Sequence, residues 1–112
     1  MGEKLQKPPG DARPSVLLAD DEEPIRRVLR AQLTARDYLV YEAGTGQEVL
    51  EETAQRRPDV VLLDLGLPDI DGIEVTRLLR QRSQVPVIIL SVRAGQSDKI
   101  AALVAGADDY LT

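Results

Sequence analysis

Three aspartates and one serine are the residues of this chain whose positions are most suited to chemistry. Each follows a short apolar segment directly: Asp20 and Asp21 follow residues 16–19, Asp64 follows 60–63, and Ser91 follows 87–90. Carboxylates that meet at one place repel one another unless a cation neutralises them. A hard divalent ion such as Mg²⁺ binds carboxylate and carbonyl oxygens and keeps waters that a phosphate can displace. The pattern therefore predicts a cation site next to a hydroxyl.

Each of these residues also has a plainer interpretation on its own. An aspartate pair after a strand is often a polar loop or the start of a helix, and a single aspartate is often a turn residue. Together, however, Asp20, Asp21, Asp64 and Ser91 follow three separate apolar segments, and a solvated surface gives no reason for that placement. We therefore favour the functional interpretation.

The composition limits the other kinds of chemistry and the partners. The chain has 112 residues with no histidine and no cysteine, which excludes disulfides, cysteine-histidine zinc sites and serine-histidine-aspartate triads. Its 14 basic and 19 acidic residues give a net charge of -5, so we expect no direct binding of nucleic acid. The apolar segments are too short to cross a membrane and the N-terminus lacks an apolar secretory signal, so we expect a cytoplasmic protein.

The apolar segments recur at a spacing that leaves room for one helix between each pair. They begin near residues 15, 39, 59, 86 and 109, with amphipathic stretches between them. This alternation predicts an α/β fold with a doubly wound parallel sheet of five strands and four helices. Residues 1–14 read as a flexible leader and residues 15–112 as one domain. Such sheets bind ligands at the carboxyl ends of their strands, where the four candidate residues lie.

The helices are predicted from their apolar stripes and their end signals. We expect these residues to face inward: Ile25, Val28, Leu29 and Leu33 in the first helix; Val49, Leu50 and Ala54 in the second; Val75, Leu78 and Leu79 in the third; Ile100, Leu103 and Val104 in the fourth. The expected end signals are Thr45 or Gly46 opening the second helix, Asp71-Gly72 before the third, Ser97 or Asp98 capping the fourth, and Gly106 stopping it. In the first helix, Arg26, Arg27 and Arg30 are predicted to point away from the apolar stripe.

The segment Asp64-Leu65-Gly66-Leu67-Pro68-Asp69-Ile70-Asp71-Gly72 carries a specific family likeness. Here the sequence resembles the receiver domain of bacterial two-component response regulators, and the resemblance extends over residues 16–112. Within that family it is similar to the potassium-transport (KdpE) type of the OmpR/PhoB group, mainly over residues 63–69 and 97–112. The resemblance implies the flavodoxin-like strand order 2-1-3-4-5.

The resemblance also implies a role for each candidate residue. Asp64 would accept a phosphoryl group from the phosphohistidine of a sensor histidine kinase, and Ser91 would hydrogen-bond that group after transfer. Mg²⁺ would be held by Asp21, Asp64 and the backbone carbonyl of Gly66, with Asp20 supporting the waters on the metal. Phosphoryl transfer of this kind depends on positioning and on neutralisation of charge.

The same resemblance assigns a switch to Ser91 and to Tyr110, the aromatic residue that moves inward when the serine moves. We expect no turnover beyond self-phosphorylation and autodephosphorylation of Asp64. The switch would control an output, and a DNA-binding domain for transcription is expected only in a longer parent chain.

Two departures from the family pattern matter. Val92 stands where the family has a small residue, and the sequence stops at Thr112, where the family continues with a lysine, a proline and a fifth helix. Lys99 is interpreted as a surface charge of the fourth helix. Without a fifth helix, one sheet face would be left with the first helix alone, and we expect self-association or a homodimer through it.

Two other functions stay open. The missing lysine makes a receiver-like interaction module that binds partners without phosphorylation a serious alternative. A phosphotransferase of the haloacid dehalogenase type is a remote one, because it needs Asp-x-Asp directly after the first strand, whereas Asp64-Leu65-Gly66 lacks the second carboxylate.

Overall fold

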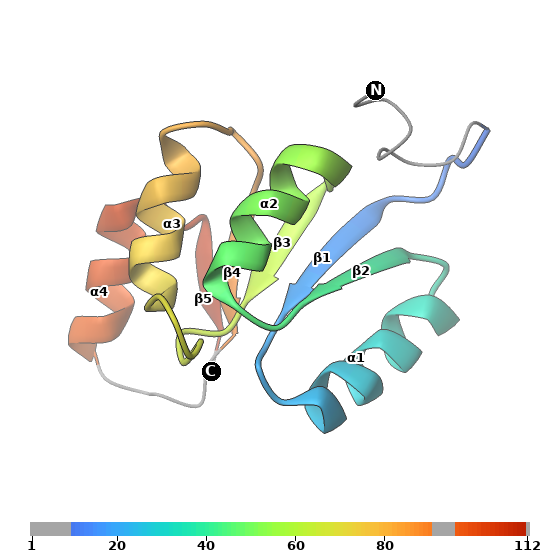
Figure 1. Cartoon of the computed structure of the whole chain (residues 1–112), viewed down its shortest axis with the longest axis horizontal. Coiled ribbons are helices and arrows are strands. Elements are labelled where there is room, and N and C mark those ends of the chain that lie inside the picture. The colour runs from blue at the N-terminus through green and yellow to red at the C-terminus, as the bar shows by residue number, and fades with distance from the viewer. Residues whose placement is uncertain (1–9, 91–95, 112) are drawn as a thin grey trace.

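Strands and helices alternate along the chain (Figure 1). The computed structural model describes residues 10–90 and 96–111. Its strands are β1 (Ser15–Ala19), β2 (Leu39–Ala43), β3 (Val60–Leu63), β4 (Val87–Leu90) and β5 (Asp109–Leu111). Its helices are α1 (Glu23–Ala35), α2 (Gly46–Arg56), α3 (Gly72–Arg80) and α4 (Gln96–Ala105). The first four strands begin within one residue of the predicted positions, because each apolar segment is bounded by polar residues or proline.

The strands form one parallel sheet in the order β2-β1-β3-β4-β5. β1 lies between β2 and β3, and its last residue, Ala19, pairs with both Ala43 and Leu63. The backbone bonds continue one step past the strands, since Asp20 N–H donates to the Ala43 carbonyl and Asp64 N–H to the Ala19 carbonyl. The predicted doubly wound parallel fold is confirmed, and its register brings Asp20 and Asp64 to one edge.

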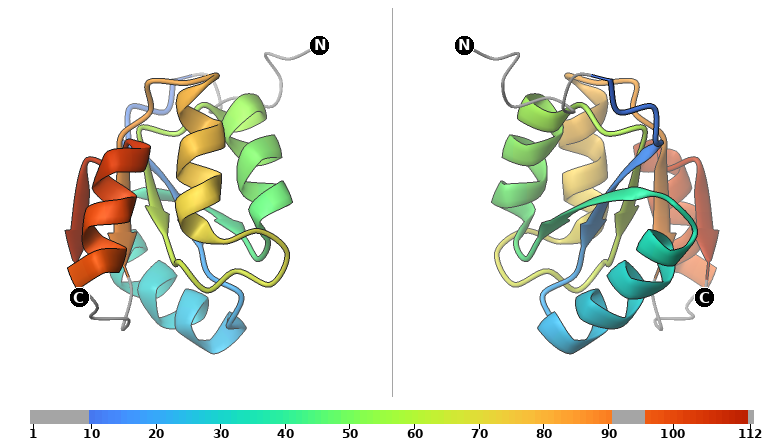
Figure 2. Two further views of the ribbon diagram at one scale, coloured as in Figure 1. Left: turned by 90° about the vertical axis from the view of Figure 1, so that its left-hand side faces the viewer. Right: turned by 90° about the vertical axis from the view of Figure 1, so that its right-hand side faces the viewer.

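The two faces of the sheet are covered unequally (Figure 2). Helices α2, α3 and α4 lie on one face and α1 on the other. The core lies on the three-helix face. There, five fully buried side chains of the sheet pack against residues of these helices: Leu17, Val61, Leu63, Val87 and Ile89. Burial of side chains of this size stabilises a fold by about 1.5–3 kcal/mol each, so this face carries most of the stability.

The apolar stripe of α1 is less covered than predicted. No residue of α1 is buried, and Ile25 and Val28 are 41% and 57% exposed. Leu29 and Leu33 are half-buried. Among the residues that the structure describes, α1 has no neighbouring helix on its face, so the outer part of its stripe meets water.

The stripe predicted for α4 is wrong. Ile100, Leu103 and Val104 are 53%, 41% and 82% exposed, whereas Ala102 is fully buried. A small residue on the packed side lets a helix approach its neighbours closely, and the larger aliphatic residues then lie outside. The same error occurs once in α2, where Ala54 is exposed and the adjacent Thr53 is buried.

The end signals of the helices are mostly confirmed. The Thr45 hydroxyl accepts a hydrogen bond from Glu48 N–H, and the Asp71 carboxylate accepts one from Ile73 N–H, so both cap helices. Gly106 ends α4 with a φ of 117°, which a glycine adopts without strain. The predicted cap of α4 is wrong, because the helix begins at Gln96 and includes Ser97 and Asp98.

The predicted leader is described only in part. Residues 1–9 lie outside the described residues, and in the remainder Arg13 forms an ion pair with Asp11. The domain boundary at residue 15 stays a prediction, although β1 begins there. Within the described ranges, no helix combines the length and the apolarity needed to cross a bilayer.

We expect Gly72→Ala to destabilise the protein by about 1–3 kcal/mol, because it overpacks a filled space. A Cβ at Gly72 would lie 2.7 Å from Leu65 Cα and 2.8 Å from the Asp64 carbonyl oxygen, which are backbone atoms and cannot move aside. The free energy of unfolding in urea measures this effect. Gly66→Ala is the matched control, since its Cβ would make one ordinary contact at 3.4 Å. Equal stability of the two variants would contradict the packing argument.

Candidate functional site

Three carboxylates meet at the carboxyl edge of the sheet. Asp20 and Asp21 directly follow β1, and Asp64 directly follows β3. One carboxylate oxygen from each lies within 4.8 Å of the others, so the three side chains are able to hold one cation. Asp20 and Asp64 are half-buried and Asp21 is exposed. The structure therefore brings together the three aspartates that the sequence predicted.

The electrostatics of the cluster favour a bound cation. Burial raises the pKa of Asp64, and the negative charges of Asp20 and Asp21 raise it further, against hydrogen bonds from the Gly66 and Leu65 backbone. Part of this rise comes from repulsion by the two neighbouring carboxylates, and a divalent ion relieves that repulsion. An all-oxygen donor set of this kind suits a hard ion such as Mg²⁺.

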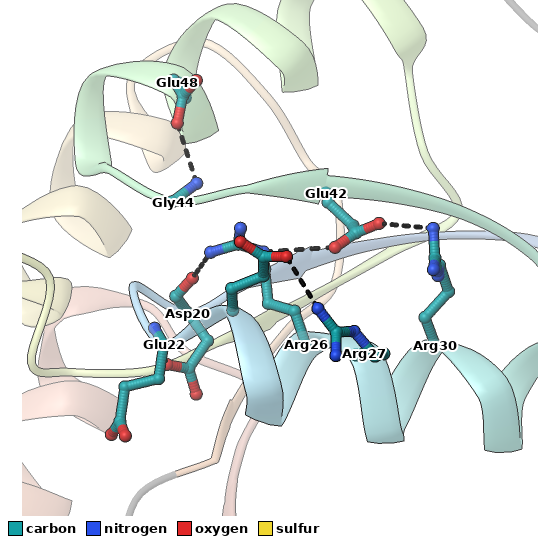
Figure 3. Close-up of polar contacts among 9 residues, drawn as sticks. Asp20, Glu22, Arg26, Arg27, Arg30, Glu42, Gly44 and Glu48 are labelled. Carbon is teal, nitrogen blue, oxygen red and sulfur yellow. Dashed lines mark hydrogen bonds and ion pairs between the residues drawn. The ribbon is translucent and has the colours of Figure 1, made fainter.

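Asp20 is held by hydrogen bonds to its side chain and to its backbone (Figure 3). Its Oδ1 accepts from Glu22 N–H at 2.9 Å, and its carbonyl oxygen accepts from Arg26 Nη1 at 2.5 Å. The same guanidinium donates through Nε to Glu42 at 3.1 Å, and Glu42 also pairs with Arg30 at 3.2 Å. Arg26 therefore connects the end of β1 to β2.

Sequence reasoning missed the contact between Arg26 and Asp20. It grouped Arg26 with Arg27 and Arg30 as residues that point away from the apolar stripe. The one available signal was Glu42, a charged residue in the otherwise apolar segment 39–43.

Asp69 ties the loop after Asp64 to α2. Its carboxylate accepts backbone hydrogen bonds from Gly46, Gln47 and Ile70 at 2.7, 3.0 and 2.9 Å. The hydrogen bonds from Gly46 and Gln47 make the largest contributions to lowering the pKa of Asp69. Gly46 is required here, because a Cβ would lie 2.9 Å from side-chain atoms of Ile70 and Val75. The sequence placed Asp69 in the motif but gave it no role.

The other predicted site residues are described only in part. Gly66 is exposed and adjacent to Asp64, since a Cβ on it would lie 3.4 Å from Asp64 Oδ2. The backbone of Tyr110 pairs with Ile89 in β5, but its side chain is outside the description. Ser91 and Val92 lie outside the described residues. The roles of Gly66, Ser91 and Tyr110 stay predictions.

Two hollows of the surface lie away from the carboxylates. A cavity of about 550 Å³ lies between the C-terminal parts of α2 and α3, at the opposite edge of the sheet, and includes Leu50, Thr53, Leu79 and Val85 in its wall. A shallow apolar hollow of about 350 Å³ lies on α1. Neither is lined by a residue of the acidic cluster, so neither is part of the candidate site.

Comparisons with known proteins agree on one family. The model of the response regulator receiver domain matches residues 16–112. The transcriptional regulatory proteins KdpE of Escherichia coli K12 and of Mycobacterium tuberculosis CDC 1551 are 59% and 55% identical to this chain over 98 and 97 residues. Those matches cover 88% and 87% of this chain but 44% and 43% of the relatives, so the chain spans less than half of their length.

A solved structure shows the same fold. The receiver domain of the Francisella response regulator 1452 superposes with a TM-score of 0.84 at 36% identity, covering 89% of this chain and 84% of that one.

We expect Asp64→Asn to raise the thermal midpoint of the protein in a chelator. The amide keeps the shape of the side chain and removes one of three mutually repelling charges. Glu51→Gln is the control, since it removes one exposed carboxylate of α2 that lies outside the cluster, and it should leave the midpoint nearly unchanged. A lower midpoint for Asp64→Asn would show that repulsion does not dominate at this site.

We expect Asp69→Ala to lower the thermal midpoint in a pH-dependent way. Because the folded-state pKa of Asp69 is below its ordinary value of 3.8, its contribution is complete above 3.8 and is lost as the pH falls through the folded-state pKa. The midpoint gap between wild type and variant should therefore be constant near neutral pH and shrink in acid. A gap that does not change with pH would mean that the charge of Asp69 is not what holds the loop.

Proposed function

The chain belongs to the response regulator receiver family, and we propose that it accepts a phosphoryl group on Asp64. The observation that carries the proposal is the cluster itself. Asp64 follows strand β3, whose residues are buried and half-buried in alternation, is itself half-buried and has two further carboxylates within 4.8 Å. The family model covers this region as part of residues 16–112.

The raised pKa of Asp64 supports its role as the nucleophile. Its carboxylate is more basic than an exposed one, yet half-buried rather than enclosed, so an incoming phosphoryl group can approach. One oxygen of Asp64 attacks the phosphorus of a phosphohistidine. A P–O bond forms, the P–N bond breaks, and its electron pair returns to the imidazole nitrogen of the donor.

Asp21, Asp64 and the Gly66 carbonyl would hold Mg²⁺, with Asp20 acting through water. When bound, Mg²⁺ supplies positive charge that neutralises the carboxylates and the phosphoryl oxygens. The protein's own part is to fix these oxygens before the donor arrives: Asp20 is held by Glu22 N–H and Arg26, and the loop after Asp64 by Asp69.

Ser91 and Tyr110 are proposed as the residues that respond to phosphorylation. In the sequence Ser91 comes directly after β4, the strand that pairs with β3, and Tyr110 is a residue of the neighbouring strand β5. A hydroxyl at position 91 would donate to a phosphoryl oxygen, and Tyr110 would follow its movement. The support is their place in the fold together with membership of the family.

The partners follow from the same membership. We propose a sensor histidine kinase as the phosphodonor and the cytoplasm as the place of action. We also propose that the chain self-associates through the sheet face on which α1 lies alone among the described helices. The relatives from E. coli and M. tuberculosis are named transcriptional regulatory proteins, so a DNA-binding output in a longer parent chain is the proposed target of the switch.

Acetyl phosphate with Mg²⁺ should add one phosphoryl group to this chain, read by intact-mass spectrometry and lost on mild base treatment. Asp64→Asn should abolish the mass gain. The control is Asp71→Asn, which changes another carboxylate of the same loop and should keep it. Labelling of Asp64→Asn at the wild-type rate would remove Asp64 from the role, and no labelling of the wild type would favour an interaction module that works without phosphorylation.

A further inference from the structure

We propose that Arg26 is a positioning residue for the cation site, which holds the peptide between Asp20 and Asp21 in the conformation that cation binding requires. The inference rests on the proposed function, since it concerns the same three carboxylates. The inference adds Arg26, a residue of α1. Arg26 would not contact the cation itself but would act through the backbone of Asp20 and Asp21.

The contact with the backbone of Asp20 is direct. Arg26 Nη1 donates to the Asp20 carbonyl at 2.5 Å, and this carbonyl belongs to the peptide bond that joins Asp20 to Asp21. On the other side of the residue, Asp20 N–H donates to the Ala43 carbonyl at 3.1 Å. With the peptide before Asp20 held by Ala43 and the peptide after it held by Arg26, the backbone torsions of Asp20 have little freedom, and the plane of the Asp20–Asp21 peptide is fixed with them. The direction in which the exposed Asp21 side chain leaves the backbone depends on this plane.

Arg26 is itself held in place. Its side chain is 18% exposed, and its Nε donates to Glu42 at 3.1 Å. A Cβ on Gly44 would lie 3.2 Å from Arg26 Nη1, so the guanidinium also packs closely against the turn after β2. Arg30 pairs with the other Glu42 oxygen, which fixes the orientation of that carboxylate. Figure 3 shows the guanidinium between Asp20 and Glu42.

These contacts require the shape of arginine. Two different nitrogens of one planar group bond two acceptors, of which one lies in β2 and the other directly after β1. A lysine ammonium is a single point charge on a flexible chain and does not reproduce this fork. The positive charge of Arg26 lies beside the cluster and repels a bound cation, so its removal alone would strengthen binding, whereas loss of the positioning contact weakens it.

Arg27 provides the matched control on the same helix. It pairs with Glu23 at 3.0 Å, and both side chains are more than 60% exposed, at 67% and 68%. Ion pairs this exposed contribute little to stability. Replacing Arg27 therefore removes one positive charge from α1 without touching the Asp20 backbone.

The experiment is a calorimetric titration of Mg²⁺ into wild type, Arg26→Gln, Arg26→Lys and Arg27→Gln. We expect Arg26→Gln to weaken Mg²⁺ binding about tenfold, or about 1.4 kcal/mol, and Arg26→Lys to weaken it nearly as much. Arg27→Gln should stay within about twofold of wild type, because its charge is screened by solvent. Glu42→Gln should weaken binding less than Arg26→Gln does, because it loosens the guanidinium without removing it.

Any of the following outcomes would overturn the inference. Full rescue by Arg26→Lys would mean that the two-nitrogen contact is not needed, and equal losses in Arg26→Gln and Arg27→Gln would mean that the contact with the Asp20 carbonyl is not what supports binding. If Arg26→Gln lowers the free energy of unfolding in the presence of a chelator but leaves the Mg²⁺ affinity unchanged, Arg26 is a purely structural residue. If the wild type does not bind Mg²⁺, the proposed function fails together with this inference. If the wild type binds Mg²⁺ and Arg26→Gln binds it equally well, the inference alone fails.

Discussion

The repulsion among Asp20, Asp21 and Asp64 is the constraint around which this sheet edge is built. At about 4 Å, two like charges near a protein surface repel by about 4 kcal/mol at an effective dielectric constant of 20. The register of β1 and β3 holds the backbones that carry these carboxylates side by side, because Ala19 pairs with Leu63 and the next backbone bond joins Asp64 to Ala19. Five fully buried side chains of β1, β3 and β4 offset that cost at about 1.5–3 kcal/mol each. The stability of the core therefore keeps the three carboxylates close together, and a cation bound between them would relieve their repulsion.

The loops around the cluster are held by polar contacts rather than by apolar packing. Asp69 bonds three backbone N–H groups, two of them at the start of α2, and Arg26 bonds the Asp20 carbonyl from α1. The loop after β3 is thus anchored to α2, and the loop after β1 is anchored to α1, so two helices share the task of positioning. Polar anchors of this kind let the loops stay at the surface, where the proposed phosphodonor would reach Asp64, without losing their conformation.

The sequence was informative wherever a local pattern decides the structure. Apolar segments bounded by polar residues placed the strands, and because all strands are parallel, Asp20, Asp21 and Asp64 could be predicted to meet. The contacts of Arg26 were not predictable, since its partner Glu42 lies in a different element and its neighbours Arg27 and Arg30 carry the same charge. The face of α4 was mistaken because large aliphatic residues were assumed to be inside, whereas the structure buries Ala102 and exposes Val104. Ser91 lies outside the described residues, and its role still rests on the family resemblance.

The most direct test of the account is a crystal of this chain soaked in Mn²⁺, with an anomalous difference map to locate the ion. The account predicts one strong peak between the carboxylates of Asp21 and Asp64 and beside Gly66, with Asp20 one water away. A map with no peak at the carboxyl edge of the sheet, or with a peak that none of these carboxylates contacts, would contradict it.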